Sequence, residues 1–419
     1  MNPPRTPLKP LDVALAELLG FARVLADVES VSTFDADGRV LAQDIVSGLQ
    51  VPSQDNSSMD GYAVRCADVL AAQKTASSTL AVSQRIAAGS VGAPLQPMSV
   101  ARIFTGAPIP LGADAVVMQE DCELMPASFD AQSPQVRIKV VPTQGQWIRR
   151  AGEDVTLGAS VLLKGELLTP ASLGLAASIG INLLPVVRRP RVALFSTGDE
   201  LVMPGDVAPE QMKPGTIYNS NRFFLRALLV RLGCEVTDLG IVPDRLDATV
   251  EALRSAAQSH DLILTSGGVS VGEEDHIKPA VQSLGTLDLW QIAIKPGKPF
   301  AYGHVQGTHF IGLPGNPVSS FVTFLLLVRP FLRKLQGVMD FAPKSIAANA
   351  HFTCARADKR QEFLRVHRNA AGGLDLFPNQ SSGVLTSAVW GDGLVDNPAG
   401  QTIAHGDVVR FIPFSELLG

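Results

Sequence analysis

The stretch "DLILTSGGVSVGEEDHIKP" (residues 261–279) decides the fold class, because an apolar run leads into a glycine-rich loop and then into a helical pattern. The run at 261–265 predicts a buried strand, and 277–284 predicts a helix. A glycine-rich loop between a strand and a helix usually holds an anion on its backbone N–H groups. This loop nevertheless carries three acids, Glu273, Glu274 and Asp275. We therefore expect an α/β fold in which positive charge for an anion comes from outside the loop.

The same alternation of strands and helices extends over residues 188–335. It implies right-handed crossovers and a doubly wound, mostly parallel sheet covered on both faces. Ligands bind at the carboxyl ends of the strands in such sheets. The predicted strands are 191–197, 235–242, 261–265, 289–294, 300–305 and 309–313, and the predicted helices are 219–232, 246–258, 277–284 and 317–335.

The flanking regions show a different pattern. Residues 8–28 predict an amphipathic helix, and residues 38–51 predict a strand. The segment 52–144 consists of short β-like runs between turn residues, which indicates an inserted β-rich module. Residues 145–187 are mixed, with a helix expected from Thr169-Pro170 to Gly180. The last segment, 336–419, alternates again as strands do, with Gly372-Gly373 as a hairpin turn.

Bulk composition excludes several classes of protein. The net charge of −5 argues against general nucleic-acid binding, which usually needs a basic face. The longest apolar run, 321–328, is too short to span a bilayer, and the N-terminus lacks the apolar core of a signal peptide. The four cysteines are far apart in sequence, which predicts reduced thiols. We expect a cytoplasmic protein with neither nucleic acid nor membrane as a partner.

The glycine loop after residue 265 fits neither of two common nucleotide motifs. Gly267 and Gly272 have the spacing of a P-loop, but Glu273 and Glu274 replace its Lys-Ser/Thr pair. The adjacent glycines 267 and 268 also break the dinucleotide-binding pattern. The loop remains either an anion cradle or a tight turn that requires positive φ.

Two further stretches are candidates for anion binding. In "LPGNPVSS" (313–320), Asn316 and Pro317 open a long helix, and Gly315 allows a ligand to approach the free N–H groups. In "IKPGKPF" (294–300), Lys295 and Lys298 flank a rigid Pro-Gly turn, which suits an oxyanion. The alternatives are ordinary helix initiation and a solvated surface turn.

Acidic residues accumulate on the same set of loops. Asp199-Glu200, Asp244 and Asp275 follow three predicted strands that should end at one rim. Carboxylates beside a phosphate favour a hard cation such as Mg²⁺, although any one of them could be a solvated surface acid. By contrast, "SSMDGYA" (57–63) and "IRRAGEDVTLG" (148–158) match no motif of known chemistry and read as hairpin turns.

Nine runs taken together carry a family resemblance that covers nearly the whole chain. The sequence resembles the MoeA-type molybdopterin molybdenumtransferases, to which the C-terminal domain of gephyrin is related. The runs occur in the family's order: "SSMDGYA", "IFTGAPIP", "GQWIRRAGED", "STGDEL", "TSGGVSVGEED", "IKPGKPF", "LPGNPVSS", "RQEFLRV" and "QSSGVLTS".

The resemblance implies four domains and a homodimer. These are an elongated mixed domain (1–51 and 145–187), a β-rich insertion (52–144), an α/β molybdopterin-binding domain (188–335) and a C-terminal β-barrel (336–419). The active cleft would lie between the α/β domain of one subunit and the insertion of the other. A molybdopterin adenylyltransferase and recipient molybdoenzymes would be further partners.

The resemblance also implies a reaction and a set of residues. Adenylylated molybdopterin would receive molybdenum from molybdate, with Mg²⁺ or a similar divalent cation assisting the release of AMP. Glu200, Asp244 and Asp275 would bind the cation. Asp60, Thr105 and Asp154 match positions associated with activity. Molybdate would contact Lys295, Lys298, Arg360 and Ser387, with both lysines also catalytic. Molybdopterin would contact Ser220, Asn221, Gly267, Gly268, Ser270, Gly272, Pro314, Gly315, Asn316, Pro317 and Ser319.

Three positions depart from the family pattern, and two rival functions remain open. Arg245 stands where the family often has a second aspartate, His276 where tyrosine is common, and Trp390 in the run "AVWGDGL" that replaces an Ala-Asn-Gly-Leu type of run. The rivals are a molybdopterin adenylyltransferase, which is usually the α/β domain alone, and a non-catalytic gephyrin-like scaffold.

Overall fold

The computed structural model describes residues 8–75, 78–125, 133–268 and 276–418. These residues form two compact units. The large unit comprises residues 1–43, 164–169 and 183–419, and the small unit comprises 44–163 and 170–182.

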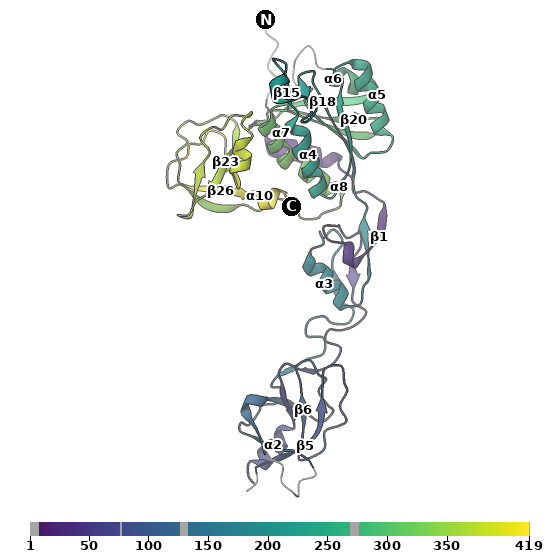
Figure 1. Cartoon of the computed structure of the whole chain (residues 1–419), viewed down its shortest axis with the longest axis vertical. Helices are drawn as coiled ribbons and strands as arrows, with labels where there is room; N and C mark the ends of the chain where they lie inside the picture. The colour runs from purple at the N-terminus through teal and green to yellow at the C-terminus, as the bar shows by residue number, and fades with distance from the viewer. Residues whose placement is uncertain (1–7, 76–77, 126–132, 269–275, 419) are drawn as a thin grey trace. The chain divides into compact units, whose positions relative to one another are not determined.

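A six-stranded mixed sheet forms the centre of the large unit (Figure 1). Its strand order is β16-β13-β17-β21-β20-β18, and the first four strands are mutually parallel. Successive residues of one strand face opposite sides, so a sheet that is covered on both faces needs continuous apolar runs. The strands are β13 (Arg191–Thr197), β16 (Glu235–Val242), β17 (Leu262–Ser266), β18 (Gly285–Gln291), β20 (Pro299–Val305) and β21 (Thr308–Leu313).

Helices cover both faces of this sheet, as predicted. Val192 and Leu194 share one core with helices α1, α4, α7 and α8, whereas Ala193 and Phe195 share another with α5 and α6. Two apolar faces on one strand therefore produce two separate cores. The helices are α1 (Leu11–Phe21), α4 (Ser220–Arg231), α5 (Leu246–Ala257), α6 (Ile277–Leu284), α7 (Pro317–Thr323) and α8 (Arg329–Leu335).

Two predicted elements of the large unit have the wrong bounds. The helix expected at 8–28 ends at Phe21, because Val28–Ser32 is strand β1, which pairs with β12 (Leu183–Val187). The strand expected at 289–294 divides between two sheets. Strand β18 ends at Gln291, whereas β19 (Ile294–Lys295) pairs with β23 (Gln361–Arg368) of the C-terminal sheet. An apolar run does not show where the chain leaves one sheet for another.

The helix predicted at 317–335 is continuous but contains a π-helical turn, η4 (Phe324–Val328). Pro330 follows this turn, and proline has no N–H to donate to a carbonyl of the preceding turn. The wider π turn before it accommodates this missing hydrogen bond.

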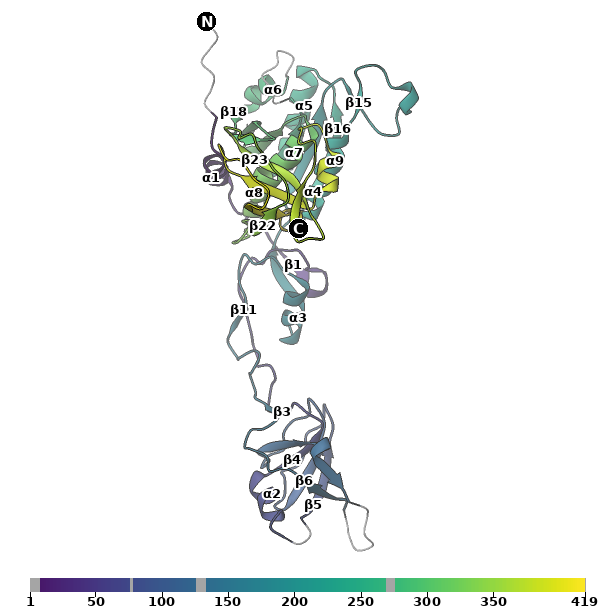
Figure 2. The same ribbon diagram turned by 90° about the vertical axis from the view of Figure 1, so that its left-hand side faces the viewer.

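The C-terminal part of the large unit is a closed β-barrel (Figure 2). Strands β23, β24, β22, β26 and β25 pair in that order, and β25 pairs back onto β23. Phe363, Leu394 and Ile412 join the same buried core as the helices of the α/β part, so the two parts share apolar packing. The remaining elements here are β22 (Ile346–Ala350), β24 (Gly373–Leu376), α9 (Thr386–Trp390), β25 (Gly393–Asn397), β26 (Val408–Pro413) and α10 (Phe414–Leu418).

Short elements connect these parts of the large unit. Strand β14 (Leu201–Val202) pairs in parallel with β15 (Ile217–Tyr218), which places the segment after β13 beside the start of α4. The two short 3₁₀ turns are η1 (Thr33–Asp35) and η3 (Pro209–Gln211). No helix among the described residues is long and apolar enough to cross a membrane.

The small unit is β-rich, as expected for its sequence pattern, and its six-stranded sheet has the order β7-β4-β6-β5-β9-β8. The strand predicted at 38–51 is wrong, because only Ile45–Val46 (β2) is a regular strand there, paired with β11 (Ser160–Leu162). Ser47 and Gly48 interrupt the apolar pattern after it. The other elements are β3 (Asn56–Ser57), β4 (Gly61–Val64), α2 (Cys66–Ala72), β5 (Leu80–Ile86), β6 (Ser99–Ile103), β7 (Ala115–Met118), η2 (Gln119–Asp121), β8 (Cys122–Leu124), β9 (Gln135–Ile138), β10 (Ile148–Arg149) and α3 (Pro170–Ser178).

Candidate functional site

Four loops that follow parallel strands line one cavity of about 780 Å³, which we call the rim cavity. Strands β13, β16, β17 and β21 run parallel, so their carboxyl ends meet at one edge of the sheet. Three predicted ligands, Ser270, Gly272 and Asp275, lie outside the described residues. The predicted residues that do line the cavity are Glu200, Ser220, Asn221, Asp244, Gly267, Gly268, Pro314, Gly315, Asn316, Pro317 and Ser319.

A buried amide holds two of these loops together. The Asn221 side chain is buried, and its Nδ2 donates to Ser266 Oγ and to the Gly315 carbonyl, both at 2.7 Å. Gly267 has φ of +95°, and a Cβ there would lie 3.0 Å from the Thr197 carbonyl oxygen. The loops after β13, β17 and β21 are therefore close-packed, and the glycine is required by both its φ and its contact.

Asn219 is a second buried amide at the rim cavity. Unlike Asn221, it was not predicted from the sequence as a ligand. Its Oδ1 caps α4 by accepting from the Arg222 N–H at 3.2 Å. Its Nδ2 is buried, lines the rim cavity and has no hydrogen-bond partner among the described residues. Because an unpaired buried donor costs free energy, this amide favours a ligand with an acceptor atom. From the sequence, the position of Asn219 just before a helix predicts only a helix cap.

The start of α7 is partly occupied by the C-terminal domain. Asn316 is the N-cap residue but makes no side-chain capping hydrogen bond. The Val318 N–H donates to the Ser382 carbonyl at 2.9 Å, and Gly383 lines the cavity. The "QSSG" segment (residues 380–383) therefore forms part of the wall of the rim cavity. Sequence order alone places this segment with the barrel and not with the glycine loops.

The charged groups of the rim cavity are acidic. Glu200 is exposed, Asp244 is half-buried, and the described lining includes no Lys, Arg or His. Two carboxylates provide the hard oxygen ligands that Mg²⁺ prefers, so the site fits such an ion. Among the described residues no group of three His, Cys, Asp or Glu side chains is close enough to hold a metal.

The "KPGKP" turn lies beside the same cavity. A Cβ on Gly297 would approach the Thr323 side chain and lie 3.4 Å from the Ser319 carbonyl oxygen, so the turn packs against α7. Pro299 lines the cavity. Lys298 is exposed, and within the described part of the chain its ammonium has no partner.

Lys295 and Arg360, two predicted oxyanion ligands, are already bound to carboxylates. Lys295 Nζ lies 2.9 Å from Glu362 Oε1 and 3.3 Å from Asp358 Oδ2. Arg360 binds both oxygens of Asp358 at 3.0 Å. We call Lys295, Asp358, Arg360 and Glu362 the ion-pair cluster. Glu362 raises the pKa of Lys295 by hydrogen bonding, and Arg360 holds the pKa of Asp358 far below its usual value.

The Ser387 side chain faces neither the rim cavity nor the ion-pair cluster. Its side chain is fully buried, and its hydroxyl donates to the Val384 carbonyl at 2.7 Å and accepts from Arg365 Nε at 3.1 Å. Arg365 is itself buried, which lowers the pKa of its guanidinium to about 10. It also reaches the Ser381 carbonyl, so this second arginine of "RQEFLRV" contacts the "QSSG" segment. The motif pattern alone pointed to Arg360 instead.

Three motifs meet within the small unit. Asp60 Oδ1 accepts from both the N–H and the hydroxyl of Thr105 at 2.8 Å, so the structure brings these two predicted residues together. These hydrogen bonds, with a smaller contribution from Arg102, lower the pKa of Asp60. Strand β3 pairs with β10, which connects this turn to the segment before Asp154. Asp154 is exposed, and its N–H donates to the Val51 carbonyl.

Comparison with known proteins covers nearly the whole chain. Residues 9–180 match the MoeA N-terminal region (domain I and II), 193–334 match a probable molybdopterin binding domain, and 347–414 match the MoeA C-terminal region (domain IV). The molybdopterin molybdenumtransferase of Haemophilus influenzae is 40% identical over 98% of this chain and 99% of its own.

The chain belongs to the MoeA family.

Other relatives agree with this assignment, and the resemblance inferred from nine short runs is confirmed. Molybdopterin molybdenumtransferase 2 of Mycobacterium tuberculosis is 38% identical over 88% of this chain and 90% of its own. A crystal structure of a molybdopterin biosynthesis MoeA protein from Pyrococcus horikoshii has a TM-score of 0.77 at 31% identity, covering 97% of this chain and 99% of that one. The predicted fold class is confirmed as well.

Two of the three residues that depart from the MoeA pattern make local side-chain contacts. Arg245 binds Asp247 within its own turn, at 2.7 Å between Nη2 and Oδ2. His276 precedes α6, and its side chain makes no capping hydrogen bond. Trp390 packs against His367 and Phe377, with ring centroids 5.3 Å apart in both pairs. None of the three residues lines the rim cavity.

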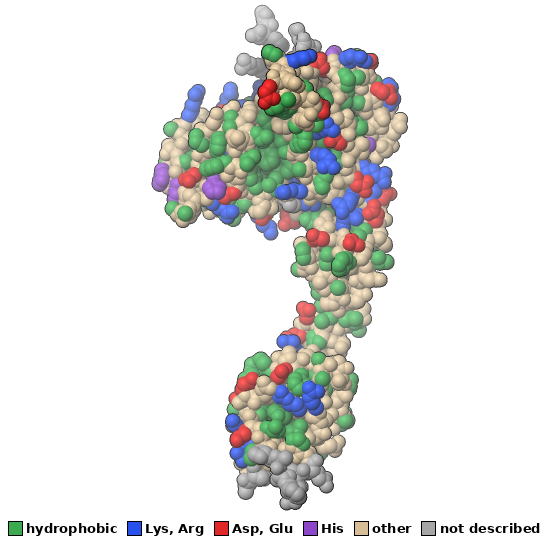
Figure 3. Space-filling view, in the orientation of Figure 1, with side chains coloured by type: hydrophobic (Ala, Val, Ile, Leu, Met, Phe, Trp, Pro, Cys, Tyr) green, Lys and Arg blue, Asp and Glu red, His purple; other side chains and the backbone are tan. Residues whose placement is uncertain are grey.

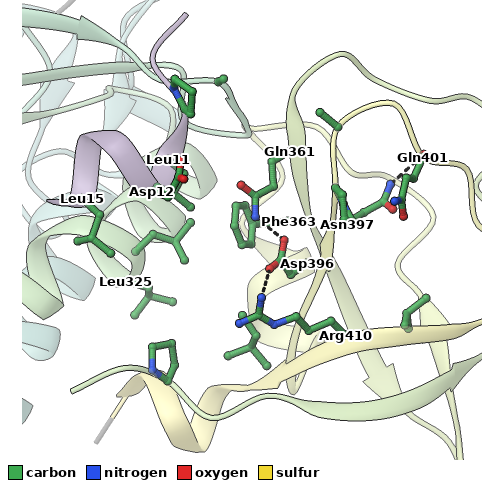
Figure 4. A pocket seen from close by; sticks show the side chains of 18 of the residues that line it. Leu11, Asp12, Leu15, Leu325, Gln361, Phe363, Asp396, Asn397, Gln401 and Arg410 are labelled. Atoms are coloured by element: carbon green, nitrogen blue, oxygen red, sulfur yellow. Dashed lines mark hydrogen bonds and ion pairs between the residues drawn. The ribbon is translucent and has the colours of Figure 1, made fainter. Parts of the chain in front are cut away.

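A larger cavity of this MoeA-family chain, about 1100 Å³, lies elsewhere in the large unit (Figure 4). Leu11, Leu15 and Leu325 face Gln361, Asp396 and Arg410 across it, with Asp396 bonded to both polar neighbours. Figure 3 shows hydrophobic side chains gathered on this unit where the barrel meets the α/β part. None of the residues predicted from the sequence lines this cavity, so its size does not identify the chemistry.

Proposed function

We propose that this MoeA-family protein is a transferase that inserts molybdenum from molybdate into adenylylated molybdopterin and releases AMP. The observation that carries the proposal is the rim cavity. Residues that the sequence predicts on four separate loops line it together. The names of the family relatives support the same reaction class.

We assign the neutral groups of the rim cavity to the molybdopterin. The backbone N–H of Gly268 would approach its phosphate, and the unpaired Asn219 amide would donate to an acceptor atom. Glu200, Asp244 and Asp275 would hold Mg²⁺. A bound Mg²⁺ would polarise the phosphoanhydride. It would also neutralise phosphate charge, because the described lining has no cation to do so.

Molybdate would bind beside the cavity, at Lys298 and the two cations of the ion-pair cluster. Ammonium and guanidinium donors suit a tetrahedral dianion. The Ser387 hydroxyl is buried and committed to two partners, so we give it a supporting position behind the "QSSG" segment rather than a direct contact.

We also propose a homodimer in which Asp60, Thr105 and Asp154 of one copy act on the substrate bound by the other. This would account for functional motifs in the small unit, whose residues line none of the rim cavity. The molybdopterin adenylyltransferase and recipient molybdoenzymes are the partners we expect before and after the reaction.

The test is the release of AMP and the formation of molybdenum cofactor from adenylylated molybdopterin and molybdate. We expect both to require the protein and Mg²⁺, and Glu200→Gln to raise the Mg²⁺ concentration needed for half-maximal rate by about tenfold, the effect of one lost charged ligand. No AMP above a protein-free control would leave only the scaffold function. Adenylylation of molybdopterin by ATP would instead support the adenylyltransferase.

A further inference from the structure

Two of the three cations proposed to bind molybdate, Lys295 and Arg360, are already paired with carboxylates in this structure. Lys295 contacts Glu362 and Asp358, and Arg360 donates two hydrogen bonds, from Nε and Nη2, to the Asp358 carboxylate. Two cations and two carboxylates give the ion-pair cluster a formal charge of zero. A dianion added to a neutral cluster of this kind gains little from electrostatic attraction, so one carboxylate must leave first.

The two carboxylates differ in how firmly they are held. The Glu362 side chain is 5% exposed, lies within strand β23 and also accepts from Asn397 Nδ2 at 3.4 Å. Asp358 is 19% exposed and lies outside any strand, in the segment that precedes β23. Releasing Asp358 to solvent would break no sheet pairing, whereas releasing Glu362 would leave a buried carboxylate without its cation. Asp358 is therefore the exchangeable carboxylate.

Asp358 also occupies the positions that an oxyanion would take. One oxygen accepts from Arg360 Nε and from the Arg360 N–H, and the other accepts from Arg360 Nη2 and lies within reach of Lys295 Nζ. Two neighbouring oxygens of a tetrahedral oxyanion can make the same pair of contacts with a guanidinium. The carboxylate thus resembles the ligand in geometry.

We propose that Asp358 is a built-in competitor, which occupies the oxyanion site until a dianion displaces it. The proposal rests on the proposed function, because it assumes that this cluster binds molybdate. Displacing one carboxylate with a monoanion leaves the cluster's charge unchanged and gains nothing. A dianion can in addition use Lys298, which follows Lys295 in the same turn and has no partner among the described residues. Asp358 therefore sets both the affinity of the site and its preference for dianions.

The test measures binding of sodium molybdate to the full-length protein by calorimetry at constant ionic strength. Asp358→Asn removes the competing charge, and we expect the Kd for molybdate to fall by about fivefold, the size of a partly exposed ion pair. Asp358→Glu keeps the charge and should keep a Kd near that of the wild type. Asp358→Asn should also let nitrate compete with molybdate, which nitrate does not do in the wild-type protein.

Asp392→Asn is the matched control. Asp392 pairs with Arg368 at the opposite end of strand β23, so this variant has the same net charge but an intact cluster. Equal tightening by both variants, or unchanged or weaker binding by Asp358→Asn, would overturn the proposal. If Lys298→Ala weakens binding while Asp358→Asn has no effect, the oxyanion site stands and the competitor does not. If neither the wild-type protein nor any variant binds molybdate, the oxyanion site and the competitor role of Asp358 are both refuted.

Discussion

The rim cavity and the ion-pair cluster are neighbours in the large unit but are built in opposite ways. The rim cavity is lined by glycines, amides and two acids, and its described lining carries no cation. The ion-pair cluster consists of charges that already cancel one another. On our proposal, the first binds a phosphate together with a metal ion. The second exchanges a carboxylate before it binds an oxyanion.

Lys298→Ala gives the largest expected effect, because Lys298 is an exposed cation of the "KPGKP" turn with no ion-pair partner among the described residues. We expect molybdenum insertion to fall by about 100-fold, as when a single donor to a developing or bound oxyanion is removed. The free energy of unfolding should change by less than about 0.5 kcal/mol, because the side chain is exposed. Insertion rates and urea unfolding of the same samples measure the two quantities.

Lys344→Ala is the control for this variant, because Lys344 is also exposed but precedes β22, away from the turn. An equal loss in both variants would mean that net charge matters and position does not. The contrast between the two regions would then lose its functional meaning.

Asn221→Ala tests the preformed character of the rim cavity. The substitution leaves Ser266 Oγ and the Gly315 carbonyl without their shared donor, so we expect unfolding to become easier by about 2 kcal/mol. The Kd for AMP should rise as well, because the loops after β17 and β21 lose their common anchor. Urea unfolding and AMP calorimetry provide the two readouts. Normal stability in this variant would show that glycine packing alone maintains the cavity.

Asp60→Asn has the smallest expected effect on stability and extends the comparison to a carboxylate held mainly by neutral donors. Thr105 lowers the pKa of Asp60, so its contribution to stability is present above the ordinary value near 3.8 and is lost as pH falls through the lower folded-state pKa. Wild type should therefore have a slightly higher Tm than the variant at pH 7, and the difference should shrink below pH 4. A difference that does not depend on pH would mean that the charge of Asp60 has no part in it.

Much of the α/β part followed from local patterns. The bounds of α5, α6 and β17 were predicted almost to the residue, because apolar runs, glycines and helix-start residues are local signals. The division of 289–294 between two sheets was not predictable, because pairing partners lie far away in sequence. The early end of α1 was missed because strand β1 depends on pairing with β12, about 150 residues later.

The sequence by itself determined the family, the fold class and the list of candidate residues. Glycines, lysines and acids keep their chemical character wherever the chain places them. Only the tertiary structure decided how those residues are grouped. It brought Asn221 between two loops, gave Lys295 to Glu362 and Asp358, and buried Ser387 behind Arg365. The physical reason is that charge and hydrogen-bond energies depend on the neighbouring atoms, and those neighbours come from distant parts of the chain.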